Sequence, residues 1–171
     1  MISQDKSLGA QLDSAIQADP ATYPVLDRAK YPEVYSYLEN MRDDILRSDY
    51  INYKDDFVWK LTIIDDKTLN AFAAPGGYIY FYTGIISYLD SASHLAGVMG
   101  HEMAHADRRH SMKQMWQNLG VSILLKVITG GDAEALQKVL GGLVGLKFSR
   151  EDERDADRFS VRYLSDTDFD P

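Results

Sequence analysis

The 171-residue chain contains no cysteine. This absence excludes disulfides, thiolate zinc ligands and a cysteine nucleophile, so any bound metal must be held by His, Asp or Glu. Long apolar runs are also missing: the two most apolar stretches, "LGVSILLKVITGG" and "VLGGLVGLKF", are shorter than the roughly 20 residues that span a bilayer. The N-terminal "MISQDKSLGAQLDSAIQ" has no basic segment followed by an apolar one, so no signal peptide is visible.

Basic residues are in the minority, with 18 Lys and Arg against 26 Asp and Glu and a formal net charge of -8. Phosphate binding needs clustered Lys and Arg, so we expect no nucleic acid partner. Hydrophobic residues make up 45% of the chain, which is typical of a globular domain.

The order of patterns, helices followed by a small β-sheet and then more helices, predicts a mostly helical α+β fold. We expect the sheet to be a small meander with an irregular middle segment, and the helix from Ser91 to continue unbroken to about Asn118, with Asp90 or Ser91 as its N-cap. The expected helices are 3–19, 31–49, 91–118, 119–128, 132–146 and 150–164, and the expected strands are 58–65 and 77–84.

All four histidines lie between positions 94 and 110, and "HEMAH" occupies residues 101–105. On a helix His101 and His105 are about 40° apart and one turn along the axis, so both imidazoles can reach one ion. Glu102 lies about 100° from His101, close enough to act on a water at that ion. This layout suits hydrolysis at zinc, and "LAGVMGHEMAHA" is too apolar for an exposed stretch.

The other two histidines fit a ligand role less well. His110 does not match the third histidine of a metzincin site, because Arg108 and Ser111 stand where that motif needs Gly and His. On a continuing helix His110 would point about 140° away from His105. We therefore interpret it as a packing or hydrogen-bonding residue, and His94 as a surface or groove residue.

A catalytic zinc usually has a third protein ligand, which here must be a carboxylate. "FSREDERDAD", residues 148–157, contains five. On a helix Glu153 and Asp157 share one face, so one can bind the ion while the other supports a ligand. Glu151, Asp152 and Asp155 alternate with arginines and are expected to be solvated surface charges; all five could also be surface charges.

Three segments, "NAFAAPGGYIYFYTGII", "LAGVMGHEMAHADRRHS" and "SREDERDAD", resemble in order and spacing the HtpX-like, CAAX prenyl protease-type zinc metallopeptidases, metallopeptidase family forty-eight. The resemblance covers about residues 58–164. It implies a zincin-like domain in which the edge of the small β-sheet borders the active-site helix. It also implies one zinc ion per chain, held by His101, His105 and Glu153. It further implies Asp157 as a supporting residue and Glu102 as general base.

The resemblance also implies a substrate groove. The stretch before Pro75 resembles an edge strand along which an extended peptide pairs through its backbone, with a plain turn as the alternative. The residues expected to bind a polypeptide substrate are Asn70, Ala71, Phe72, Ala73, Gly76 and Gly77.

The chain departs from membrane-embedded members of that family, so it is more similar to the branch that is periplasmic, or membrane-anchored and facing the bacterial periplasm, and acts in envelope protein quality control. The apolar segments 119–128 and 139–148 have three alternative roles: to form a lid, to contact a membrane surface or to complete the core. We favour the core. We expect residues 1–50 to form a helical segment packed on a catalytic domain at 51–171, itself truncated at its C-terminus.

Two functions from different classes remain. A zinc endopeptidase is favoured by Glu102, because a structural zinc site needs no base beside its ligands. A chaperone-like or latent zinc-binding module is favoured because no His follows His110 to stabilise an oxyanion. If the chain is not a fragment lacking that donor, Tyr163 or an Arg is expected to replace it.

Overall fold

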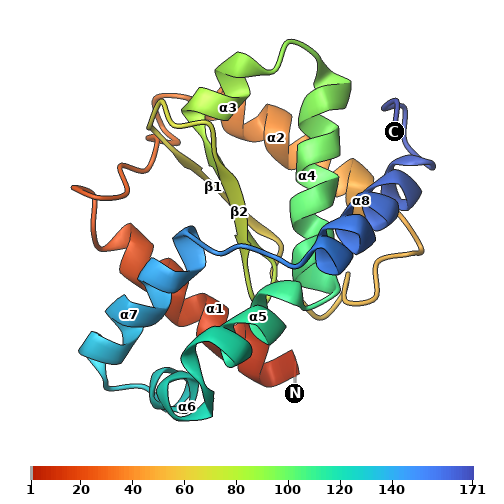
Figure 1. Ribbon diagram of the computed structural model, residues 1–171. Coiled ribbons are helices and arrows are strands. Elements are labelled where there is room, and N and C mark those ends of the chain that lie inside the picture. Colours follow the sequence, from red (N-terminus) through yellow and green to blue (C-terminus); the bar gives the residue numbers. More distant parts are fainter. Residues whose placement is uncertain (1) are drawn as a thin grey trace.

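The computed structural model describes residues 2–171, and its helices surround a small central sheet (Figure 1). The α+β prediction is confirmed. The helices are α1 (Ile2–Gln17), α2 (Pro32–Leu46), α3 (Thr83–Tyr88), α4 (Ala92–Asp107), α5 (His110–Leu119), α6 (Val121–Thr129), α7 (Ala133–Val144) and α8 (Arg150–Leu164). The strands are β1 (Lys60–Ile64), β2 (Ala71–Ala74) and β3 (Tyr78–Tyr82).

The sheet has the order β1-β3-β2, with β1 parallel and β2 antiparallel to β3. The expected meander is therefore wrong, and the segment expected to be irregular contains β2. The β2–β3 turn contains Gly76 and Gly77, whose φ values of 84° and 90° favour glycine. This tight turn pairs β3 directly with β2. Strand β3 also pairs with β1, so it lies in the centre of the sheet and β2 lies at an edge.

The two faces of the sheet carry alternate residues and bury two cores. Odd-numbered side chains such as Leu61, Ile79 and Phe81 pack against α2, α4 and α8. Even-numbered side chains such as Phe72 and Tyr80 pack against α1, α5, α6 and α7. The sheet is thus the middle of three layers, with α4 and α8 on one side and α1 and α7 on the other (Figure 1).

The apolar segments near the C-terminal half complete the second of these cores. Leu124 and Val127 of α6 and Val139, Leu140 and Leu143 of α7 are buried there. The preference for a core role is confirmed. Among residues 2–171, no helix combines the length and apolar character needed to cross a bilayer.

The helix expected over 91–118 is interrupted. Ser91 caps its start by accepting a hydrogen bond from the His94 N–H at 3.1 Å, but α4 ends at Asp107 and α5 begins at His110. Arg109, between them, has a left-handed φ of 60°. The prediction of an unbroken helix is wrong, and the change of direction alters where His110 points.

Helix α2 packs into the same core as the sheet and α4, through buried residues that include Leu38 and Met41. The Tyr35 hydroxyl also donates to the Leu26 carbonyl at 2.8 Å. A division of the chain at residue 50 stays a prediction.

Candidate metal centre

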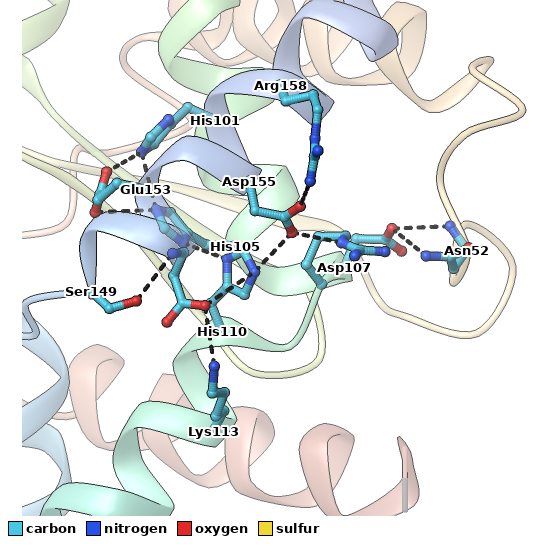
Figure 2. Close-up of polar contacts among 12 residues, drawn as sticks. Asn52, His101, His105, Asp107, His110, Lys113, Ser149, Glu153, Asp155 and Arg158 are labelled. Carbon is cyan, nitrogen blue, oxygen red and sulfur yellow. Dashed lines mark hydrogen bonds and ion pairs between the residues drawn. The ribbon is translucent and has the colours of Figure 1, made fainter.

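His101 and His105 lie one turn apart on α4, and their Nε2 atoms are 3.0 Å apart. Glu153 of α8 completes the cluster: its carboxylate oxygens lie 3.2 Å from His101 Nε2 and 3.6 Å from His105 Nε2. One ligand atom from each of the three residues lies within 4.8 Å of the other two. Figure 2 shows the three side chains converging from the two helices.

Small residues let α8 approach α4 closely enough for this convergence. A Cβ added to Gly100 would lie 2.6 Å from Ser160 Oγ, so only glycine fits there without a shift. The Ser160 hydroxyl in turn donates to the Gly97 carbonyl at 3.1 Å. At the start of α8, Ser149 Oγ accepts from the Asp152 N–H at 3.1 Å and caps the helix.

Asp157 lies one turn beyond Glu153, with Oδ1 2.8 Å from His101 Nδ1. Since an ionised carboxylate only accepts hydrogen bonds, this contact places the proton of a neutral His101 on Nδ1. The Nε2 lone pair then faces His105 and Glu153. The side chain of Asp157 is 73% exposed, so it reaches His101 from the rim of the site.

This donor set fits a zinc ion. Two imidazole nitrogens and one carboxylate form a ligand combination found at catalytic zinc, and a fourth position is left for water. A cation placed among them would also offset the repulsion between facing lone pairs and the negative charge of Glu153.

His105 is the buried member of the pair, with 1% of its side chain exposed. Burial, followed by the neighbouring His101 and His110, lowers its pKa to about 3. The imidazole is therefore neutral at physiological pH, the form that binds metals.

Glu102 is part of the cleft but not of the ligand cluster: it lines the space beside His101, His105 and Glu153. Burial first, and then repulsion from Glu153, raise the pKa of its carboxyl to about 8. A divalent cation beside both carboxylates would oppose that repulsion and favour the ionised form of Glu102.

Phe148, which no sequence pattern singled out, covers His105. The two rings stack with centroids 3.8 Å apart and an interplanar angle of 14°. Together with Leu143, Val144 and Leu146, Phe148 lines one side of a cleft of about 140 Å³ above the cluster. From sequence alone, an apolar residue between two helices is expected in the core. The contact of Phe148 with His105 depends on the tertiary structure.

Strand β2 and the residue before it form the opposite side of the cleft, through Asn70, Ala71, Phe72 and Ala73. The Tyr82 N–H donates to the Asn70 carbonyl at 3.1 Å, so the alternation of an antiparallel ladder directs the backbone groups of Ala71 and Ala73 away from β3. Ser111 Oγ already donates to the Ala73 carbonyl at 3.0 Å. The N–H and C=O of Ala71 and the N–H of Ala73 thus face the free edge.

Gly76 and Gly77 are not brought to the cleft, contrary to expectation. Both are buried in the β2–β3 turn. Gly76 lies against the backbone of α1 at Lys6, and Gly77 against Trp59. Their conformation serves the turn, which explains why the sequence contains two glycines there.

The carboxylates of residues 148–157 are not all exposed or buried as predicted. Glu151 is exposed, as expected, but Asp152 is buried and Asp155 is mostly buried, with 13% of its side chain exposed. Asp152 lies 3.3 Å from Lys113 Nζ, and Asp155 accepts from Arg108 Nε at 2.8 Å. Although burial raises the pKa of Asp155, hydrogen bonds from Arg108 and Arg158 lower it to about 2.

Two further expectations concern residues near the site. His94 is exposed and contacts Asp90 at 3.1 Å, in agreement with a surface or groove position. Tyr163, expected as a replacement oxyanion donor, is fully buried and donates its hydroxyl to Asp107 at 3.1 Å. It does not reach the cleft, so that assignment is wrong.

Asp107 is a buried residue that the sequence did not single out. Its carboxylate also accepts hydrogen bonds from the backbone N–H groups of Asn52 at 3.0 Å and Tyr53 at 2.8 Å. It therefore ties the end of α4 to α8 through Tyr163 and to the loop before β1 through Asn52, the contact that Figure 2 shows. Burial raises its pKa, and these hydrogen bonds oppose the rise.

Comparison with known proteins identifies a family whose members resemble this chain. Residues 33–171 match the model of Peptidase family M48. The chain is 30% identical over 152 residues to a putative beta-barrel assembly-enhancing protease of Vibrio cholerae, covering 81% of this chain and 31% of that protein. It is 32% identical over 114 residues to the mitochondrial metalloendopeptidase OMA1 of Arabidopsis thaliana, covering 66% of this chain and 24% of that protein. The chain thus spans about a quarter to a third of the length of these relatives.

Proposed function

The chain belongs to peptidase family M48, and from this membership and the site's geometry we propose that it is a zinc-dependent endopeptidase. The observation that carries the proposal is the convergence of His101, His105 and Glu153 on one point, with Glu102 beside them. In this proposal those three residues hold one zinc ion per chain, and Asp157 supports His101.

A zinc ion at such a site supplies Lewis acidity, because it lowers the pKa of water and polarises a peptide carbonyl. The residues of the chain do the rest. Glu102 accepts a proton from the attacking water and returns it to the amine that leaves when the peptide bond breaks. Glu102 is suited to this exchange because it lines the cleft next to the ligands, and no side chain among residues 2–171 holds it in a hydrogen bond.

The substrate proposed for this site is an extended or misfolded polypeptide. The outward N–H and C=O of Ala71 and the outward N–H of Ala73 would pair with its backbone, while the Asn70 side chain adds a contact. Backbone pairing does not depend on side-chain identity, so this groove favours conformation over sequence. An unfolded segment provides that conformation.

The proposed setting is cell-envelope protein quality control, in the bacterial periplasm or on a membrane facing it. Support comes from the names of relatives, the beta-barrel assembly-enhancing proteases of Vibrio cholerae and of Escherichia coli, the latter 31% identical over 122 residues. The mitochondrial relatives have similar identity, so the proposed setting rests on the bacterial relatives alone.

A second candidate, a latent zinc-binding module, is favoured by the narrowness of the cleft. Its volume of about 140 Å³ is below the roughly 300 Å³ at which ligand pockets usually begin. Phe148 and the end of α7 line the side of this cleft that faces β2, and they limit the width available to a peptide there.

Digestion of unfolded casein separates the two candidates. We expect wild-type activity to be removed by a chelator and restored by zinc. Glu102→Gln should lower the rate about 10²- to 10⁴-fold with zinc content unchanged, because it loses the base but no ligand. Glu151→Gln, an exposed residue outside the cleft, is the matched control and should retain the wild-type rate.

A rate that neither Glu102→Gln nor the chelator changes would contradict the catalytic assignment. A wild-type protein that binds zinc at the three ligands but does not cleave casein would instead support the latent module.

A further inference from the structure

His110 reaches His105 because the chain changes direction after α4. Arg109 adopts its left-handed φ of 60°, and its guanidinium makes two hydrogen bonds, of 2.8 and 2.9 Å, to the buried carboxylate of Asp5 in α1. A left-handed arginine is an uncommon conformation that needs such a fixed partner. The turn brings His110 Nδ1 to 3.0 Å from His105 Nδ1.

On its other side His110 meets a carboxylate. His110 Nε2 lies 3.1 Å from Asp155 Oδ2 and 3.8 Å from Asp152 Oδ1. His110 is itself buried, with 6% of its side chain exposed. The contacts form one chain from Asp155 through His110 to His105, which Figure 2 shows on the side of His105 away from Glu153.

The direction of these hydrogen bonds follows from the chemistry of the Asp155 carboxylate at one end of the chain of contacts. A carboxylate only accepts, so the proton of a neutral His110 lies on Nε2 and its Nδ1 is an acceptor. His105 must then donate from Nδ1, which leaves the lone pair of its Nε2 free. This atom is the one that faces His101 and Glu153.

We propose that His110, oriented by Asp155, is a positioning residue that fixes the tautomer and ring orientation of His105 for metal binding. This role rests on the proposed zinc site. It assigns His110 a hydrogen bond to a ligand and excludes it as a ligand, because its Nδ1 faces Nδ1 of His105 and lies on the far side of that ring from the cluster.

The pairing around Asp155 supports the same direction. Arg108 and Arg158 both donate to its carboxylate, which keeps it ionised and therefore an acceptor. Lys113 similarly pairs with Asp152. These three cationic side chains thus bind the carboxylates, and the Nδ1 atoms of His105 and His110 form a hydrogen bond with each other.

Zinc affinity measured by competition with a chelating dye tests this role. His110→Leu removes the acceptor but keeps much of the volume, and we expect its zinc dissociation constant to rise about 10- to 100-fold. In His110→Asn the side-chain oxygen can accept from His105 Nδ1, and we expect affinity within a few-fold of wild type. His94→Leu, which removes an exposed histidine, is the control.

A role in packing alone predicts the opposite order, because Leu fills the buried site better than Asn. Equal affinities for wild type and His110→Leu, or equal losses in Leu and Asn variants that both melt cooperatively, would therefore overturn the proposal. A wild-type protein without zinc affinity would overturn the metal site itself, and this role with it.

Imidazole nitrogen NMR of the zinc-loaded wild type provides a second readout that needs no variant to fold. We expect the proton of His105 on Nδ1 and that of His110 on Nε2. A proton on His110 Nδ1 would contradict the proposed direction.

Discussion

Two carboxylates of α8 contact the histidines of α4 in different ways. Asp157 accepts directly from His101 at 2.8 Å, whereas Asp155 contacts His105 only through His110. The first contact lies at the exposed rim and the second in the interior. In both cases an acceptor on the Nδ1 side leaves Nε2 to face Glu153.

Removal of Asp157 should weaken metal binding far more than it weakens the fold. We expect Asp157→Ala to raise the zinc dissociation constant about 10- to 100-fold, and to change stability by less than about 0.5 kcal/mol, because the side chain is exposed. Asp157→Asn, which keeps an acceptor, should fall between that variant and wild type. Chelator competition and urea unfolding measure the two quantities.

Asp166→Ala serves as control, since Asp166 is an exposed carboxylate just beyond the end of α8. Zinc affinity of Asp157→Ala equal to that of this control would show that the contact with His101 has no effect on the metal site.

At the scale of single residues, helical periodicity is enough to predict which candidate site residues share a helix face. The spacing of His101 and His105, and of Glu153 and Asp157, fixes which side chains share a face within one helix. It could not predict that Asp155 is a buried partner of His110, because that contact depends on the turn at Arg109. The turn in turn depends on Asp5, which is more than a hundred residues away.

At the scale of elements, helix α1 packs closely against the β2–β3 turn at Gly9. A Cβ on Gly9 would lie 1.9 Å from the Pro75 carbonyl oxygen and 2.7 Å from the Tyr78 ring. A backbone atom cannot move away as a side chain can. Helix α1 therefore lies against the β2–β3 turn through this residue and supports the cleft strand from behind.

Gly9→Ala should consequently destabilise the protein by roughly 1–3 kcal/mol through overpacking, although alanine favours a helix. Gly141→Ala in α7 has no atom within 4 Å of the added Cβ and should stabilise the protein by about 0.5–1 kcal/mol. Urea denaturation of both variants measures the difference. A Gly9→Ala protein as stable as Gly141→Ala would show that α1 does not press on the turn.

The elements that the sequence misplaced are those set by long-range contacts. Strand β2 is only four residues long, and its place at the sheet edge depends on the long-range parallel pairing of β1 with β3, which puts β3 in the centre. Helix α3 directly continues β3, so no turn residues separate them and its pattern merges with the strand. Helices α1, α2, α7 and α8, by contrast, lie within a few residues of their expected ranges, because each carries its own buried face.

Considered as a whole, the molecule places its candidate site where the two cores meet. His101 and Glu153 lie on the α4 and α8 side of the sheet, while Leu143 belongs to the core on the α1 side and lines the same cleft. The edge of β2 lies between them. A site in this position is assembled only when both layers are packed on the sheet, so metal binding and folding should be linked.

The central claim is that His101, His105 and Glu153 together hold one zinc ion. Anomalous X-ray scattering at the zinc absorption edge, from crystals of the zinc-loaded protein, tests it most directly. We expect one peak at about 2.0–2.2 Å from Nε2 of both histidines and from the Glu153 carboxylate. A peak coordinated by other residues, or no peak at these three side chains, would contradict the account.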